Sequence, residues 1–600
     1  MKIDTSKTIW NLSPLFKSDD DPAIETRRNE VNNESYKFIN KWSKRNDYLE
    51  QEQALKEALD EYESLARNYG IAGHENLYLF LRQSTDQNNP EIKAKVSKLD
   101  DFKVKIINDI QFFEMRISKV SAEMQKKFLN YPGLKQYNHF LENLFNKSKY
   151  LLSEDQEKVV NLKDKSAISN WVHMLSGFID KEEREVLNNK GNRDTKSFSA
   201  ISSLLNDTNK NIRNTAAKAV NDIISKHVDV AEYELNSVLE YLKVEDELRN
   251  RDRPDLGRLV SDNIEPETID SLIESVSSRN DISKRFYKLK AKLLGVKKLQ
   301  YHEKNVPYGD IDKEISYKKT VDLIWNTFNN LDPEFSLIFK DFVENGQIDV
   351  FPKKGKRNGA FCMSLPQETP VYILLNFSNK LSDSLILAHE MGHAINDTLV
   401  RKSLHALYRD VYTATAEVAS TFCEYFVLEK FSQNADKETQ LALKMMKLND
   451  DVSAIHRQIA CYTFEQEIHK NYRVKGYLAK EQIGALFRKH MKAYLGDYVE
   501  LTEESDNWWV PWSHIRMYFY VYSYASGLLI SKYMQNAVRR DNNFINKVKE
   551  FLSAGLSESP KNIFMKLGID ITKKDFWNTG LNEVEQLLGE AETLAKQLGK

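Results

Sequence analysis

Apolar residues recur at intervals of three and four over most of this 600-residue chain. This spacing places apolar side chains on one face of an α-helix. The pattern is clear in one early segment, in the residues Leu49, Ala54, Leu55, Ala58, Leu59, Tyr62 and Leu65. Breaks such as Asn89-Pro90 and Tyr131-Pro-Gly133 separate consecutive segments of this kind. The pattern therefore predicts a mainly helical protein.

Two stretches depart from the helical pattern. Residues 1–20 are predicted to form an irregular arm, anchored on a core by Trp10, Leu12, Leu15 and Phe16. The segment PVYILLNF, residues 370–377, is short, β-branched and aromatic, which is typical of a strand, and Gly355 and Gly359 before it suit turns. A small sheet is thus expected around residues 350–378. It would either present an edge strand to an extended substrate or form a buried floor, and the sequence leaves both open.

Composition adds three constraints. The chain has only 21 Gly and 13 Pro and no Ser/Gly- or Pro-rich linker, which favours one large helical body with two lobes over a string of domains. We expect an N-terminal helical region at residues 1–190 and a catalytic region at 191–600. The net charge is 86 − 88 = −2 without a long block of one sign, so neither nucleic acid nor a membrane surface is an expected partner.

Three scattered cysteines give neither a disulfide framework nor a C-x-x-C site. No run approaches 18 apolar residues, and the first residues lack the apolar region of a secretory signal. A cytoplasmic protein is the resulting expectation, and a monomer is favoured only slightly over an oligomer.

The sequence His389-Glu390-Met-Gly-His393 carries the clearest chemistry. On a helix, residues four apart lie on the same face, so both histidines can present an imidazole nitrogen to one zinc ion. Glu390 is then the candidate general base. Three apolar residues precede the motif, and Ser382 or Asp383 is predicted as the N-cap of its helix.

A hydrolytic zinc site usually has three protein ligands and an open position for water. A third histidine in the pattern H-E-x-x-H-x-x-G-x-x-H is excluded, because the chain has Asn396 and Leu399 at the required positions. A carboxylate from a second helix is the alternative. The segment Thr413–Lys430 is predicted to be that helix, with Glu417 as the ligand and Glu424 as a residue that orients a histidine. Taken without the upstream motif, the same residues would suit an ordinary surface.

Four stretches together resemble a known family: WNLSPLF near the start, Gly359-Ala-Phe-Cys362 followed by YILLNF, LAHEMGH, and AEVASTFCE. The chain resembles the oligoendopeptidase F group of the thimet-oligopeptidase-like zinc peptidases over nearly its full length. The resemblance implies a mainly α, two-lobed, clam-like body with a small sheet beside the H-E-x-x-H helix. It also implies one zinc ion per chain in a deep channel that admits short peptides and excludes folded proteins.

Applied to this sequence, the resemblance implies His389, His393 and Glu417 as zinc ligands, Glu390 as general base, and substrate binding at Gly359. The family often continues as H-E-x-G-H-x-x-H, whereas this chain has Asn in place of the last histidine. The family's histidine at this position is not an expected metal ligand. Its replacement by Asn396 is therefore expected to affect the fine tuning of the site rather than activity itself.

An aromatic segment, residues 507–527, is the last candidate. If it is helical from Ile515 onward, His514, Tyr518 and Tyr522 share one face. The family places a histidine and tyrosines of this region beside the oxyanion of the reaction. Tyr522 is therefore the first choice for the oxyanion donor, with His514 as a second donor and His514 and Tyr518 as substrate-binding residues. An aromatic core stripe is the alternative, and we expect it for the neighbouring Phe519, Tyr520 and Tyr524 in any case.

These residues predict a zinc-dependent endopeptidase that hydrolyses short unfolded peptides. A helical metallocarboxypeptidase could share the same ligands, but it would need a cationic pocket for the substrate carboxylate, and no arginine dedicated to that role is evident near the motif. A non-catalytic peptide-binding protein with a structural metal is a third interpretation. Three ligands with an adjacent Glu390 argue against it, because structural zinc sites are usually closed by a fourth ligand.

Overall fold

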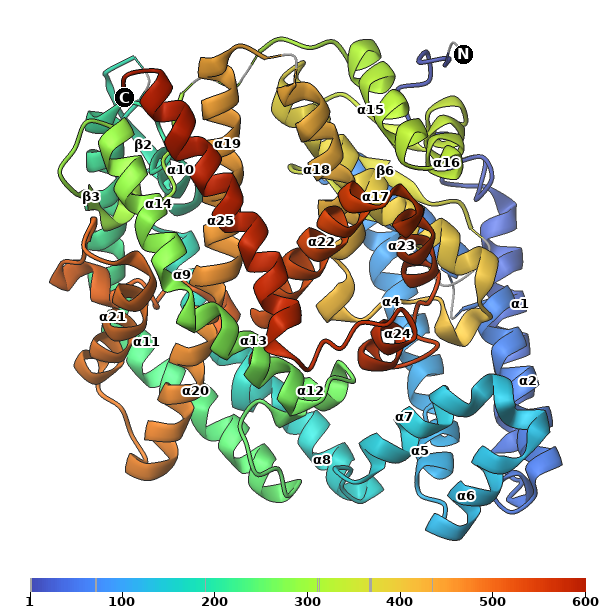
Figure 1. The fold of residues 1–600 in the computed structure, drawn as a ribbon. Coiled ribbons are helices and arrows are strands. Elements are labelled where there is room, and N and C mark those ends of the chain that lie inside the picture. Colours follow the sequence, from blue (N-terminus) through green and yellow to red (C-terminus); the bar gives the residue numbers. More distant parts are fainter. Residues whose placement is uncertain are drawn as a thin grey trace. The chain divides into compact units, whose positions relative to one another are not determined.

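The computed structural model describes residues 3–70, 73–188, 190–309, 311, 313–365, 369–433 and 435–600. The protein is mainly helical with a few short strands, which confirms the predicted fold class (Figure 1). The chain divides into two compact units, each assembled from three segments. Unit 1 comprises Met1–Lys149, Ile311–Asn434 and Met534–Ile569, and unit 2 comprises Tyr150–Asp310, Ala435–Tyr533 and Asp570–Lys600. The predicted regions 1–190 and 191–600 are a division along the sequence and stay a prediction.

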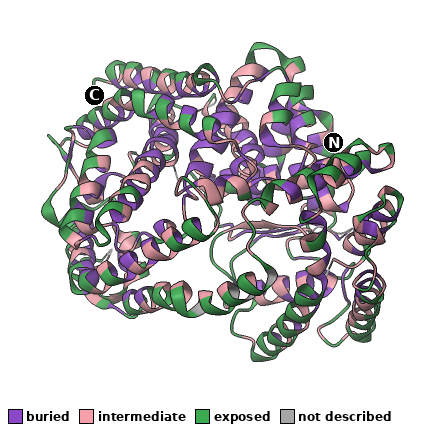
Figure 2. Ribbon diagram, turned by 90° about the horizontal axis from the view of Figure 1, so that it is seen from below, coloured by how far each residue is buried: buried purple, intermediate pink, exposed green. Residues whose placement is uncertain are grey.

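Unit 1 contains the helices α1 (Pro22–Trp42), α2 (Glu52–Asn68), α3 (Gly73–Thr85), α4 (Pro90–Ile110), α5 (Phe112–Ser118), α6 (Ala122–Asn130), α7 (Asn138–Ser148), α15 (Tyr317–Leu331), α16 (Pro333–Glu344), α17 (Leu381–Ser403), α18 (Val418–Ser432), α23 (Ile545–Leu552) and α24 (Pro560–Lys566). Buried and exposed residues lie on opposite sides of most helices (Figure 2). In α2, for example, Ala54, Leu55, Ala58, Leu59 and Leu65 are buried, as their spacing predicts.

Unit 2 contains the helices α8 (Glu154–Asp164), α9 (Asn170–Asp180), α10 (Phe198–Leu204), α11 (Lys210–Leu248), α12 (Leu256–Ser261), α13 (Pro266–Ser278), α14 (Asn280–Leu293), α19 (Lys437–Val452), α20 (Gln458–Lys475), α21 (Lys480–Leu495) and α25 (Lys574–Gln597). Helix α22 (Tyr522–Arg540) contains the boundary between the two units. Within the described residues, no helix is both long enough and apolar enough to cross a bilayer.

A three-stranded sheet in unit 1 confirms the predicted sheet around residues 350–378, of which residues 366–368 lie outside the described part of the chain. Its strands are β4 (Ile348–Asp349), β5 (Phe361–Met363) and β6 (Tyr372–Leu374), in the order β4-β6-β5. Strand β4 pairs with β6 in parallel and β5 pairs with it antiparallel. The strand that the sequence identified, β6, is thus central and fully buried, whereas β5 is a partly exposed edge.

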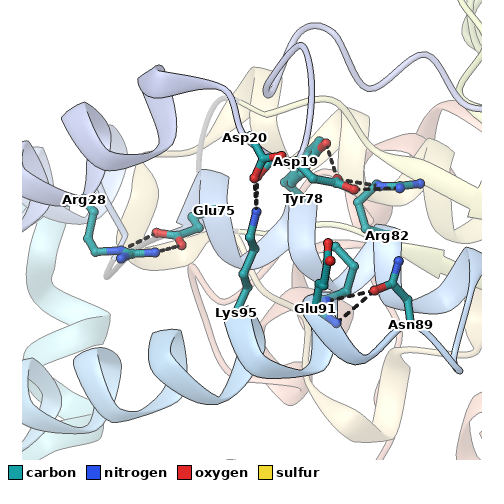
Figure 3. Close-up of polar contacts among 10 residues, drawn as sticks. Asp19, Asp20, Arg28, Glu75, Tyr78, Arg82, Asn89, Glu91 and Lys95 are labelled. Atoms are coloured by element: carbon teal, nitrogen blue, oxygen red, sulfur yellow. Dashed lines mark hydrogen bonds and ion pairs between the residues drawn. The ribbon is translucent and has the colours of Figure 1, made fainter.

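The N-terminal arm is anchored on this sheet, as predicted. The indole Nε1 of Trp10 donates a hydrogen bond to the carbonyl of Ile373 at 2.8 Å, and Leu15 and Phe16 are buried in the same apolar cluster. Polar contacts continue the attachment (Figure 3): Arg82 donates two hydrogen bonds to the carboxylate of Asp19, at 2.7 and 2.8 Å. The arm therefore covers one end of the core of unit 1.

The other polar contacts drawn in Figure 3 involve residues of α3 and α4. Arg28 and Glu75 form an ion pair, and Lys95 donates to Asp20 at 2.7 Å (Figure 3). The side chain of Asn89 accepts hydrogen bonds from the backbone amides of Glu91 and the next residue, which makes it the N-cap of α4. The predicted break at Asn89-Pro90 is thereby explained.

Unit 2 also contains strands that the sequence did not reveal. Strands β1 (Glu183–Leu187) and β2 (Arg193–Ser197) form an antiparallel hairpin, with Gly191 at a positive φ of 78° in the turn. Strands β3 (Leu299–Gln300) and β7 (Val499–Glu500) form a short parallel pair. Within the hairpin only Val186 is buried, so the alternation of apolar and polar residues that indicates a strand is almost absent.

Candidate metal centre

Helix α17 carries the H-E-x-x-H motif. It begins at Leu381 after Lys380, which is in an extended conformation, so the prediction of Ser382 or Asp383 as the N-cap is wrong. Asp383 instead lies in the first turn, where its carboxylate accepts hydrogen bonds from the backbone amides of Ser378 and Lys380, at 2.6 and 3.0 Å. The side chain still satisfies backbone donors ahead of the helix, but it acts from the third helical position.

Three donor atoms converge beside this helix. Oε2 of Glu417 lies 3.4 Å from Nε2 of His389 and 3.5 Å from Nε2 of His393. All three atoms lie within 4.8 Å of one another. Two imidazole nitrogens and a carboxylate oxygen are ligands that zinc takes, so the residues fit a three-ligand metal site. Glu417 directly precedes α18, so the predicted helix over Thr413–Lys430 begins later than expected.

A glycine explains how Glu417 reaches the histidines. Helices α17 and α18 lie side by side (Figure 1). A Cβ atom added to Gly392 would lie 2.4 Å from the carbonyl oxygen of Ala419 and 2.5 Å from Cα of Ser420. The backbone of α18 therefore occupies the space that any larger side chain would need. Small residues on both helices set the short separation that the ligand geometry requires.

A second carboxylate approaches His389 from its other side. Oε2 of Glu424 lies 3.1 Å from Nδ1 of His389, the position from which an outer carboxylate fixes the orientation of a ligand histidine. Burial alone would lower the pKa of His389, but its hydrogen bonds to Glu417 and Glu424 outweigh burial and raise the pKa to about 10. For Glu417, burial opposes the two imidazoles, which hold its pKa well below the ordinary value. The geometry places both carboxylates where the sequence predicted them, and their roles remain predictions.

Glu390 is buried, with 8% of its surface exposed. Burial raises the pKa of this carboxyl group, while the two neighbouring histidines and a hydrogen bond from the backbone of Cys362 act in the opposite direction. A carboxylate whose proton affinity is raised is better suited to accept a proton from water near neutral pH. Its neighbour Cys362 is in the edge strand β5, so the helix and the sheet meet at this residue.

The three proposed ligands and Glu390 line one cavity of about 390 Å³ within unit 1. Strand β5 and the residues beside it form one wall, and His389, Glu390, His393 and Glu417 form another. The cavity also contains Arg409, from the connection between α17 and α18, which is only 7% exposed. Arg409 could not be recognised from the sequence, because a residue 16 positions beyond His393 in an irregular connection gives no indication of its place in the fold.

Asn396, the departure from the family pattern, also lines the cavity. Its side-chain amide donates a hydrogen bond of 2.6 Å to the carbonyl of Leu552 in α23, and the residue is buried. Asn396 therefore links the motif helix to a neighbouring helix of the same unit. This contact accounts for a polar, non-ligand residue at the position.

The aromatic segment belongs to unit 2, and its predicted helix is wrong. A 3₁₀ turn covers Ser513–Arg516, and α22 begins only at Tyr522. Tyr518 and Phe519 between them have positive φ angles of 47° and 56°. A partly exposed arginine and a buried glutamate hold this backbone: Arg258 donates to the carbonyl of Tyr518 at 3.0 Å, and the carboxylate of Glu465 accepts from the amide of Phe519 at 2.8 Å. The backbone groups are thus engaged by side chains instead of by a helix.

The three predicted residues consequently do not share a face. The hydroxyl of Tyr522 is buried and donates to Asp262 at 2.7 Å, and that of Tyr518 donates to the carbonyl of Val238 at 3.1 Å. His514 instead groups with two tyrosines assigned to the core from sequence, Tyr520 and Tyr524, both of which are partly exposed.

Nε2 of His514 lies 3.1 Å from the hydroxyl of Tyr524, and its ring stacks on Tyr520 with centroids 6.0 Å apart.

A helical fold with an H-E-x-x-H motif, a third carboxylate donor and a lined cavity defines the class of metallopeptidase-like proteins. The chain belongs to peptidase family M3, whose model matches residues 186–583, and a model described as Oligopeptidase F matches residues 116–174. The resemblance to the oligoendopeptidase F group is confirmed.

Similar proteins of full length support the assignment. An oligoendopeptidase F homolog of Lactococcus lactis subsp. lactis is 24% identical over 99% of this chain and 98% of its own length. Oligopeptidase PepF of Bacillus subtilis is 24% identical over 98% of this chain and 87% of its own. The solved structure of oligoendopeptidase F from Enterococcus faecium has a TM-score of 0.72 and 17% identity, covering 96% and 99% of the two chains. That structural likeness shows the fold.

Proposed function

We propose that this member of peptidase family M3 is a zinc-dependent endopeptidase that hydrolyses short unfolded peptides. The observation that carries the proposal is the convergence of His389, His393 and Glu417 in one cavity that also contains the buried Glu390. The proposed stoichiometry is one zinc ion per chain. The relatives named as oligopeptidases and oligoendopeptidases support peptides as the substrate class.

In the proposed mechanism, His389, His393 and Glu417 would hold the metal. A bound zinc ion would supply Lewis-acid polarisation at the scissile carbonyl and at a water molecule. Glu390 would accept a proton from the water that attacks the carbonyl carbon and then donate the proton to the leaving amine. Glu424 keeps the ring of His389 in orientation through its Nδ1.

Strand β5 is the proposed docking edge for the peptide backbone. It is an edge strand, it lines the cavity, and its free side can extend the sheet by main-chain hydrogen bonds. Gly359, just before the strand, is the proposed substrate-binding turn, with a positive φ of 81° and no atom within 4 Å of where a Cβ would lie, its chain neighbours aside. The buried strand β6 serves as the floor.

Donors to the oxyanion are proposed among His514 and its tyrosine neighbours. One well-placed donor typically contributes about 3 kcal/mol to stabilising such a transition state. Tyr522 and Tyr518 already donate their hydroxyl protons to Asp262 and to a backbone carbonyl, which weakens the case for them. The ring of His514 packs against the partly exposed Tyr520, and its Nε2 lies 3.1 Å from the hydroxyl of Tyr524, so none of these three groups is singled out as the donor.

A carboxypeptidase remains the second candidate because of Arg409. A guanidinium group in the metal-site cavity is the kind of residue that binds the terminal carboxylate of a substrate. Peptides with an amidated carboxyl end separate the two activities. An endopeptidase cleaves them internally, whereas a carboxypeptidase leaves them intact.

The test of the proposed function is the variant Glu390→Ala. It should bind zinc with the stoichiometry of the wild type, measured by atomic absorption, and fail to cleave a mixed peptide library analysed by mass spectrometry. Cleavage at the wild-type rate would contradict the role of Glu390. Unchanged wild-type cleavage after complete metal removal would contradict the proposal as a whole.

A further inference from the structure

A second cavity, within unit 2, has an unusual charge. Its volume is about 200 Å³, and two basic side chains, Lys304 and Arg457, line it together with His302. None of the described residues that line it is an aspartate or a glutamate. Tyr301, Trp508 and other aromatic side chains form much of the remaining wall. Positive charge in an aromatic enclosure is costly without a counter-charge.

Arg457 ends a π-helical turn, Ser453–Arg457, that directly precedes α20. Its Nε is buried and has no hydrogen-bond partner among the described residues. Burial would lower the pKa of Arg457, and the groups that act in the opposite direction include the thiol of Cys461 and the hydroxyl of Tyr301. Burial raises the pKa of Cys461 to about 11 and that of Tyr301 further above its ordinary value, so these groups are neutral at pH 7. They do not neutralise the guanidinium group.

Lys304 lies on the aromatic wall and is 6% exposed. Its Nζ is 3.9 Å from the ring centroid of Tyr301 and 4.8 Å from that of Trp508, which gives partial stabilisation through cation–π contacts. Burial, and then the charge of Arg457, lower the pKa of Lys304 well below its ordinary value. The adjacent Glu303 is already engaged, because its carboxylate accepts a hydrogen bond of 2.8 Å from Arg213.

We propose that this cavity binds a carboxylate group between Arg457 and Lys304. A guanidinium group matches a planar carboxylate with two parallel hydrogen bonds. The aromatic walls suit the organic part of a small ligand. A neighbouring cavity of about 620 Å³ shares Tyr301, His302 and Trp508 with the first and provides room for the rest of a longer molecule. The ligand is therefore either a small carboxylic acid or the carboxyl end of a peptide.

The described residues that line this cavity belong to unit 2, whereas those that line the cavity of the proposed metal centre belong to unit 1. The inference therefore stands without the proposed peptidase mechanism. It also has a direct physical consequence: because the bound carboxylate supplies the missing counter-charge, it should stabilise the folded protein.

The test uses N-acetylglycine as the probe and its neutral amide, N-acetylglycinamide, as the matched control, in isothermal titration calorimetry with the full chain. The wild type should bind the acid and not the amide. In Arg457→Met the affinity for the acid should fall by at least about tenfold, because a charged hydrogen-bond partner is lost. The variant Lys470→Met, at an exposed position of α20, should bind as the wild type does.

Binding of the acid by Arg457→Met with unchanged affinity, equal binding of acid and amide, or binding of inorganic phosphate alone would overturn the assignment. Thermal unfolding in a buffer that contains no carboxylate or phosphate checks the folding of each variant. If Arg457→Met does not fold, Lys304→Met replaces it. A tripeptide with a free carboxyl end that competes with N-acetylglycine, while its amidated form does not, would support a peptide as the source. If the acid binds as predicted and neither tripeptide form competes, the result supports a small carboxylic acid.

Discussion

Glu424 is the residue of α18 whose carboxylate lies 3.1 Å from Nδ1 of His389. In the proposed metal site, this contact would fix which nitrogen faces the metal and how the ring is turned. We expect Glu424→Gln to lower the zinc affinity by about 10- to 100-fold while the fold is retained. Competition with a chromophoric chelator measures the affinity. The control is Glu429→Gln on the same helix, and an equal loss in both variants would refute an effect through His389.

Asn396 illustrates a residue whose role became visible only through its partner. The change Asn396→Asp keeps the shape of the side chain but replaces the amide donor with an acceptor that faces the carbonyl of Leu552. We expect a loss of about 1–3 kcal/mol in the free energy of unfolding, because a buried hydrogen bond is lost and an acceptor is left unsatisfied. Urea denaturation measures this loss. Zinc stoichiometry should remain that of the wild type, and loss of the metal would indicate that Asn396 supports the ligands directly.

At the scale of elements, the centre depends on how closely two helices pack. Gly392→Ala would place a Cβ atom against the backbone of α18 at Ala419 and Ser420, where no flexible side chain can move aside. We expect α18 to be displaced, with a loss of stability of about 1–3 kcal/mol and a weaker zinc affinity. Thermal unfolding and metal titration measure the two effects.

The matched control is Gly589→Ala in α25. An added Cβ there meets nothing within 4 Å, so the change should be neutral or slightly stabilising through the better helix propensity of alanine. If Gly392→Ala behaves in the same way as this control, close packing of α17 and α18 does not position Glu417.

At the scale of the whole molecule, buried histidines make stability depend on pH. Burial, helped by the charge of Arg279, lowers the pKa of His456 to about 3, compared with about 6.5 in an unfolded chain. Above pH 6.5, His456 is neutral in both states and does not reduce the free energy of unfolding. As the pH falls from 6.5 toward 3, the free energy of unfolding decreases, because the unfolded state then binds a proton that the folded state does not. The expected loss from this residue approaches about 1.4 kcal/mol per pH unit.

His456→Gln should therefore reduce the slope with which the free energy of unfolding falls between about pH 6 and about pH 4. Urea denaturation at several pH values measures this slope. The exposed His173 provides the control, and His173→Gln should keep the wild-type slope. An unchanged slope in His456→Gln would mean that other groups dominate the acid sensitivity of unit 2.

The sequence by itself determined the helical class, the family, the arm anchored by Trp10, and the three candidate ligands. These features depend on local periodicity or on short spacings, such as the four residues between His389 and His393, which a helix converts directly into geometry. The position of Glu417 could be predicted because small residues on its helix indicated close packing.

The tertiary structure alone decided the rest. It brought Arg409 into the metal-site cavity, and it replaced the expected helix at Tyr518 with backbone held by Arg258 and Glu465. It also placed Arg457 and Lys304, far apart along the chain, in one cavity that has no aspartate or glutamate among its described lining residues. Such features depend on contacts between distant segments and on backbone groups that bond to side chains, neither of which leaves a periodic trace in the sequence.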